Sequence, residues 1–254
     1  MPTKAHHRFV ERVASYNSDL ELCDVIVRKF ISQRNSNASI AVSLESTNER
    51  HPNLGRRTNS RNSRMIVGRH LIRTLHTSFI KDLFEDFSEF LSTTLVRAAQ
   101  RGIDPARFIG DVKLDLSASE ILKTGGWDAA VQVISDAVFR KLENERNTKD
   151  LIRKASVRLG LTLDQQIVDA AMPYLDARHI LVHRDGKSDE LYRRDYPQIA
   201  LDGDKIQINF GFVSAARDCV SALAQHIDDQ IIASGLVRRQ DMVGQQRIPP
   251  QGVD

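Results

Sequence analysis

Residues 72–95 read IRTLHTSFIKDLFEDFSEFLSTTL, and they carry the clearest structural signal in the chain. Large apolar side chains recur there every three or four residues, as they do on the buried face of an α-helix. The members of this stripe are Ile72, Leu75, Phe79, Leu83, Phe87, Leu91 and Leu95. We therefore expect one long helix from about Met65 to Arg101, ended by Gly102 and Pro105. Aromatic residues at this spacing are typical of a core face, so we interpret the phenylalanines as core.

The same helical repeat appears in several other segments. They are residues 4–34, 127–142, 148–159, 163–183 and 212–234. We expect Thr162 to cap the segment 163–183. Before the last segment, Asp202-Gly203-Asp204 separates two short runs of alternating apolar residues and predicts a β-hairpin. The whole pattern predicts an all-α fold, an up-and-down bundle of four to five core helices with a small β-hairpin before the last helix.

Composition divides the chain into three expected parts. Residues 1–64 are expected to form an N-terminal helical arm and a basic polar linker, because residues 35–63 are rich in Asn, Ser, Thr and Arg. Residues 65–235 are expected to form the helical domain, and residues 236–254, which lack an apolar pattern, a disordered tail. We expect the apolar face of the arm to pack on the bundle or in a dimer; binding of a neutralising protein is the alternative.

Length and composition narrow the class of protein. With 254 residues, 41% of them hydrophobic and 27% charged, the chain is long enough for one substantial core. Since it has neither a run of about eighteen apolar residues nor a secretion signal at its start, we expect a cytoplasmic protein without a membrane partner. Cys23 and Cys219 lie far apart in sequence and are expected to be reduced.

Positive charge is concentrated in one stretch, although the net charge of the whole chain is only +3. Between Glu49 and the next acidic residue, Asp82, the arginines are Arg50, Arg56, Arg57, Arg61, Arg64, Arg69 and Arg73. Such a tract attracts phosphate through counterion release, but a solvated linker has the same composition. Both interpretations stay open from the sequence.

A short motif carries the clearest potential for chemistry. Residues 178–183 read RHILVH at the expected end of a helix, and Arg184-Asp185-Gly186 follow. On a helix His179 and His183 share a face, and the long side chain of Arg178 is expected to reach the same groove. Arginine holds phosphate through two parallel hydrogen bonds, and histidine gains and loses a proton near neutral pH.

Three interpretations of this motif compete. In the first, the basic side chains cap helix carbonyls or pair with Asp176 or Asp185. In the second, the two histidines bind zinc, although a catalytic zinc site needs a third ligand and often has a glutamate where this chain has Ile180-Leu181-Val182. In the third, the motif cleaves a phosphodiester without metal or cofactor.

The third interpretation defines a reaction. A neutral histidine takes the proton of a ribose 2′-hydroxyl, the arginine stabilises charge on the phosphorus oxygens, and a protonated group assists the leaving 5′-oxygen. The products are a 2′,3′-cyclic phosphate and a 5′-hydroxyl. Because the route needs the 2′-hydroxyl, RNA is cut and DNA is spared.

The motif and its surroundings resemble the HEPN superfamily, whose signature is an arginine, usually a polar residue next, and a histidine four to six residues after the arginine. The resemblance covers roughly residues 65–233, and within it residues 78–85 look like the opening helix of such domains. After the motif come an Asp-Gly turn, Asp189-Glu190-Leu191-Tyr192, Tyr196-Pro197, a hairpin and a closing amphipathic helix.

The resemblance implies an α-helical bundle that dimerises so that two motif helices form one composite RNA-cleaving site. By position it implies Arg178 and His183 as the catalytic pair, and His179 as the polar residue that orients or assists. Arg184 departs from the common asparagine. Many relatives are toxins or phage-defence effectors beside an antitoxin or regulatory protein. Others bind RNA or proteins without cleavage, so a non-catalytic module stays open as the alternative.

Overall fold

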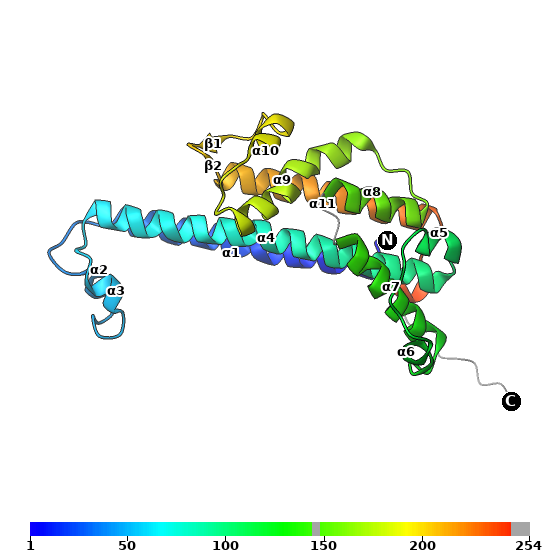
Figure 1. The fold of residues 1–254 in the computed structure, drawn as a ribbon. Helices are drawn as coiled ribbons and strands as arrows, with labels where there is room; N and C mark the ends of the chain where they lie inside the picture. Colours follow the sequence, from blue (N-terminus) through cyan, green and yellow to red (C-terminus); the bar gives the residue numbers. More distant parts are fainter. Residues whose placement is uncertain (144–147, 245–254) are drawn as a thin grey trace. The chain divides into compact units, whose positions relative to one another are not determined.

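The structure, a computed structural model, describes residues 1–143 and 148–244 and is mainly helical (Figure 1). In chain order its helices are α1 (Lys4–Ile31), α2 (Ile40–Ser43), α3 (Pro52–Gly55), α4 (Arg61–Arg101), α5 (Pro105–Ile109), α6 (Ala118–Leu122), α7 (Trp127–Glu143), α8 (Thr148–Leu159), α9 (Gln165–His183), α10 (Glu190–Asp195) and α11 (Phe210–Ala233), with a short 3₁₀ helix, η1 (Arg239–Asp241). Strands β1 (Leu201–Asp202) and β2 (Lys205–Ile206) pair antiparallel before α11. The prediction of an all-α bundle with a small hairpin before the last helix is therefore confirmed.

The chain forms two compact units whose limits differ from the expected boundary at residue 64. The bundle unit contains residues 1–13, 80–207 and 214–254, of which the described part ends at residue 244. The arm unit contains residues 14–79 and 208–213. The boundaries fall inside continuous helices because the start of α1 packs with the bundle, while the first half of α4 packs with the arm.

The core of the bundle unit is apolar and largely aromatic at its α1–α4 contact. The ring of Phe9 lies 6.5 Å from that of Phe87 and 6.1 Å from that of Phe90, and all three are buried. Helix α8 contacts α5, α7 and α9, and buries Ile152 and Leu159. Phe87 and Phe90 of α4 are buried, as the core interpretation of these phenylalanines predicts, whereas Phe84 is only half-buried.

The arm unit pairs residues 14–31 of α1 with residues 61–79 of α4 (Figure 1). Its core includes Leu20 and Val27 of α1, and Phe79 of α4, whose ring meets that of Tyr16 edge-on at 6.1 Å. The helices approach closely at Gly68, where an added Cβ would lie 2.7 Å from Val27 Cγ1. A residue without a side chain is therefore required at this crossing.

Residues 35–63, expected to form a linker with little regular structure, are folded. They contain α2, α3 and a bridge between Ser39 and Thr58, and they close on the side chain of Arg64, which is 1% exposed. Its Nη1 donates to the Asn59 carbonyl at 3.0 Å and to Asn59 Oδ1 at 2.6 Å, and its Nη2 donates to the Gln33 carbonyl. The sequence pattern missed this because the polar groups of the loop satisfy a buried guanidinium instead of facing water.

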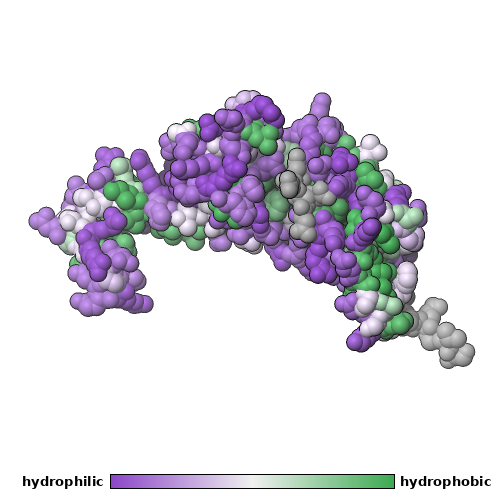
Figure 2. All heavy atoms as spheres, viewed as in Figure 1, coloured by the Kyte–Doolittle hydropathy of each residue, from purple (hydrophilic) through white to green (hydrophobic). Residues whose placement is uncertain are grey.

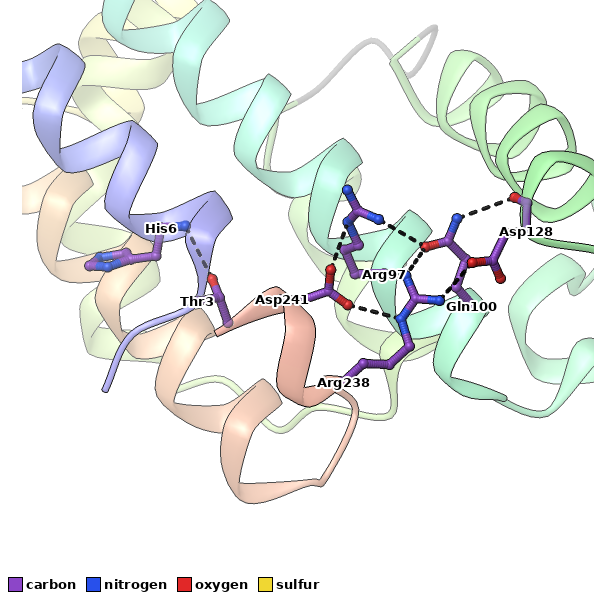
Figure 3. Close-up of polar contacts among 7 residues, drawn as sticks. All are labelled: Thr3, His6, Arg97, Gln100, Asp128, Arg238 and Asp241. Carbon is purple, nitrogen blue, oxygen red and sulfur yellow. Dashed lines mark hydrogen bonds and ion pairs between the residues drawn. The ribbon is translucent and has the colours of Figure 1, made fainter. Parts of the chain in front are cut away.

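The chain from residue 236 was expected to be disordered, and the structure corrects this for residues 236–244; residues 245–254 lie outside the described residues. Arg238 donates to Asp241 at 3.0 Å, to Asp128 at 2.8 Å and to Gln100 at 2.7 Å (Figure 3). Met242 forms a β-bridge with Thr3. The absence of an apolar repeat was misleading because hydrogen bonds and ion pairs fix this segment.

Local signals were correct at some helix ends and wrong at one. At the start of α6, Ser117 and Glu120 form a capping box, which the Ser-x-x-Glu pattern of residues 117–120 indicates. The cap of α9 is Asp164, which accepts from the Gln166 backbone N–H at 2.8 Å, and not Thr162. Aspartate is as good a cap as threonine, so the sequence alone did not distinguish between them. In the described part of the chain, no helix is both long and apolar enough to cross a membrane.

Candidate functional site

Helix α9 positions the RHILVH motif in its last two turns. Its inner face is buried through residues such as Met172, Leu175 and Ile180, which leaves the outer face of the motif accessible. The helix ends at His183, after which the backbone N–H groups of Arg184 and Gly186 both donate to the Ile180 carbonyl, at 3.0 and 3.1 Å. This closing turn holds the end of the motif in a defined conformation.

The two histidines of the motif lie together on the surface. His179 and His183 are both exposed, and their ring centroids are 4.8 Å apart with an interplanar angle of 47°. This is the arrangement expected for residues one helical turn apart. Two imidazoles at the C-terminal end of a helix, where the dipole attracts cations, can together hold and exchange a proton.

Arg178 extends toward α4. Its Nη2 donates to Glu85 Oε1 at 2.8 Å, and its guanidinium carbon lies 5.0 Å from the centroid of the Phe84 ring. Its Nε is buried and has no hydrogen-bond partner among the described residues. The side chain is 30% exposed, so one edge of the guanidinium still faces solvent.

Within one chain the structure joins the histidines to each other but not to the arginine. Among the described residues, no hydrogen bond or ion pair connects Arg178 to His179 or His183. On an α-helix, two residues that are five positions apart are separated by about 140° around the helix axis, so the side chains of Arg178 and His183 leave different faces of α9. Within a single copy of the motif, Arg178 is therefore held toward α4, whereas the two histidine rings lie together.

Acidic residues surround the arginine on the side of α4 and α7. Partial burial raises the pKa of Glu143, the negative charge of Glu85 raises it further, and the charge of Arg178 opposes both effects. Glu85 and Glu143 line a groove together with Asp86, Glu89 and Asp136, and with Arg12 and Arg140. The five acidic side chains outnumber the two arginines, so the charge of this groove disfavours a phosphate.

The two carboxylates of the structural interpretation both have partners outside the motif, and Asp176 also interacts electrostatically with His179 of the motif. Asp176 accepts a hydrogen bond from the Tyr196 hydroxyl. Burial raises the pKa of Asp176, and the charge of His179 acts to lower it. Asp185 pairs with Lys205. Arg184, the residue that departs from the family pattern, forms an ion pair with Asp189 at 2.9 Å, and this contact holds the turn after the motif against the start of α10.

Sequence reasoning missed the support that neighbouring elements give to α9. The Tyr192 hydroxyl donates to the Pro173 carbonyl at 2.8 Å, and the rings of Tyr192 and Tyr196 meet at 4.9 Å. The sequence contains one indication of the contact with Arg178. Phe84 and Glu85 lie next to the apolar stripe of α4, where a neighbouring helix can reach them. In the described parts of the chain, no group of three or more metal-ligating side chains is gathered.

Comparisons with models of protein families, with curated proteins and with solved structures gave no match for this chain.

Proposed function

We propose that the protein is a metal-independent endoribonuclease of the HEPN type. The observation that carries the proposal is the exposed His179–His183 ring pair at the end of α9, with Arg178 anchored on the neighbouring face. A surface that offers proton acceptors, a proton donor and a permanent cation suits attack of a 2′-hydroxyl on its own phosphodiester.

In the proposed reaction His183 removes the 2′-hydroxyl proton as the 2′-oxygen bonds to phosphorus. Arg178 stabilises the negative charge on the non-bridging oxygens. A protonated group gives its proton to the leaving 5′-oxygen, and we assign this role to His179 of the other motif. The bond from phosphorus to the 5′-oxygen breaks. The products are a 2′,3′-cyclic phosphate and a 5′-hydroxyl, without a metal ion or cofactor.

The geometry of one chain supports a homodimer with a composite site. Arg178 is held by Glu85 and Phe84, and it leaves the helix about 140° around the axis from His183, so we infer that a second copy supplies the arginine for the histidine pair. A twofold dimer supplies this reciprocally. A cytoplasmic toxin–antitoxin or phage-defence context, with an antitoxin or regulatory partner, belongs to the same proposal and is supported by the family resemblance.

One observation favours a second candidate function, a non-catalytic module that binds RNA or a protein. The ion pair of Arg178 with Glu85 and its contact with Phe84 neutralise and immobilise the guanidinium in the way that a purely structural arginine would be held. In this alternative the histidines only add to a polar surface.

The test compares wild-type protein with His183→Ala on total RNA in excess EDTA, followed by chemical mapping of new ends. We expect cyclic-phosphate ends from the wild type and about 100- to 10,000-fold slower cleavage by the variant, the usual contribution of a general base. His7→Ala is the matched control, because His7 is also an exposed histidine on a helix, paired at i,i+4 with Glu11.

Cleavage that EDTA abolishes would rule out the metal-independent route. RNA that is bound but left intact by wild-type protein would favour the non-catalytic module. Equal losses in His183→Ala and His7→Ala would show that the effect is not specific to the motif.

A further inference from the structure

The arm unit concentrates the positive charge of the protein. Its residues, 14–79 and 208–213, contain ten lysines and arginines against five aspartates and glutamates, a net charge of +5. The whole chain has a net charge of only +3, so the rest of the sequence is slightly acidic. No acidic residue occurs between Glu49 and Asp82.

The arginines of this stretch fall into two groups in the structure. Arg64 is buried and binds loop carbonyls. The remaining six are exposed, and among the described residues none of them forms an ion pair; they are Arg50, Arg56, Arg57, Arg61, Arg69 and Arg73. Six neighbouring cations without counter-charges repel one another, and this repulsion is relieved when a polyanion binds.

The loop that carries Arg50, Arg56 and Arg57 is folded and is held by its own hydrogen bonds. The Ile40 backbone N–H donates to the Arg57 carbonyl at 2.8 Å, and the Asn59 N–H donates to the Ala38 carbonyl at 2.9 Å. The Ser39 side chain caps α2 and donates to Asn48. Arg56 and Arg57 therefore project from a folded segment directly after α3, so their separation is fixed before any ligand arrives.

The other three arginines, Arg61, Arg69 and Arg73, extend this surface along α4. Arg69 and Arg73 are exposed and one turn apart, so they share a face of the helix that is rotated away from Gly68. Figure 2 shows hydrophilic residues over most of the surface of the α2–α3 loop, with smaller hydrophobic areas beside them. Exposed neighbours of the arginines there include Asn53, Thr58 and Asn62.

We infer that this arm surface is a second RNA-binding site, which holds the sugar–phosphate backbone through the six exposed arginines. Arginine forks match phosphate oxygens, and Asn and Thr side chains commonly add hydrogen bonds to phosphate and sugar. The arm unit also exposes Val42, Leu44, Ile66 and Leu71, the kind of side chain that a protein partner would contact. We favour RNA over an acidic protein because, in the described part of the chain, all six exposed arginines are without ion pairs and can each bind a phosphate. The choice of RNA among polyanions rests on the proposed function; the site itself requires no cleavage at His183.

The test measures binding of a short fluorescent RNA of mixed sequence to full-length protein carrying His183→Ala, in EDTA, over a series of salt concentrations. In that background Arg56→Gln, Arg57→Gln and Arg61→Gln are combined. The control combines Arg140→Gln, Arg153→Gln and Arg194→Gln, three exposed arginines of the bundle unit, which change the net charge equally.

We expect the arm variant to weaken binding at least about tenfold and to flatten the slope of log K against log salt by about 2, since each lost contact with single-stranded RNA contributes about 0.7. The control is expected to change affinity less than about twofold. If the arm variant no longer shows a cooperative thermal transition, the test is repeated with a second arm variant, Arg69→Gln combined with Arg73→Gln. These two residues lie well inside helix α4.

Three outcomes would overturn the inference. They are an unchanged salt slope in both arm variants, equal losses in arm and control variants, and tighter binding of a poly-glutamate peptide than of RNA. Failure of the proposed function is distinguishable: it leaves this binding intact while the protein with native His183 produces no cyclic-phosphate ends.

Discussion

Arg64 differs from the other arginines of its stretch because the fold uses its charge internally. Its guanidinium hydrogen-bonds the Asn59 side chain and backbone carbonyls on both sides of the loop, and it is almost completely buried. A buried cation without a carboxylate partner persists only when carbonyl dipoles replace the water it has lost. One side chain thereby organises about 30 residues that show no helical repeat.

We predict that Arg64→Met destabilises the arm loop by about 3 kcal/mol, because several carbonyls lose a charged donor while the site stays buried. The measurement is hydrogen exchange at the amides of Ser36 and Asn59, both bonded across the loop, which should become about a hundredfold faster. Arg57→Met, at an exposed position, should leave those rates unchanged. Unaltered protection in Arg64→Met would show that the loop does not depend on its central guanidinium.

The same residue shows where sequence reasoning stops. A periodic stripe predicted α4 closely, since its apolar positions repeat over residues 72–95, about seven turns of this 41-residue helix. Arg64 lies in that helix too, but nothing local distinguishes a buried arginine from the exposed ones around it. Arg64 is buried because the loop folds back and places backbone carbonyls around its guanidinium. This contact depends on the three-dimensional fold and not on the local sequence.

Among the elements, the long helices were predictable and the short ones were not. Helix α8 was expected at the limits found, whereas α2 and α3, of four residues each, complete barely one turn and leave no period to detect.

The candidate site was likewise predictable only in part. The motif on α9 was evident from its spacing, but its contact with Glu85 joins residues 93 positions apart. Only the packing of α4 against α9 revealed it.

Gly68 sets the spacing of α1 and α4 in the arm unit. In Gly68→Ala the new Cβ would lie 2.7 Å from Val27 Cγ1 and 3.2 Å from Ile31 Cδ1. Alanine favours the helix by about 1 kcal/mol, but the stiff valine cannot move aside, so we predict a net loss of about 1 to 2 kcal/mol. Thermal unfolding measures this loss.

Two further variants complete this prediction. Adding Val27→Ala to Gly68→Ala should recover part of the lost stability by removing the opposing methyl groups. Gly126→Ala is the control, since nothing lies within 4 Å of its added Cβ. A Gly68→Ala protein as stable as the wild type would mean that the helices separate without cost.

For the molecule as a whole, the direction of Arg178 makes a test of subunit cooperation possible. If Arg178 of one copy serves His183 of another, mixing inactive Arg178→Ala and His183→Ala proteins should restore about one quarter of wild-type activity, because half of the dimers are mixed and each has one intact site. Cleavage of RNA after unfolding and refolding the two variants together measures this. Mixtures that stay inactive, although light scattering shows dimers, would place both residues in the same copy.

The two ends of the described chain also meet. Thr3 donates from its backbone and its hydroxyl to Asp228, which is fully buried, and the Val243 N–H donates to the Pro2 carbonyl. The Val243–Pro2 hydrogen bond joins residues 241 positions apart in the sequence. Contacts of such sequence separation form late in folding. The bundle unit that carries the RHILVH motif is therefore closed by residues from both ends of the described chain, and we expect it to reach its native packing late in folding.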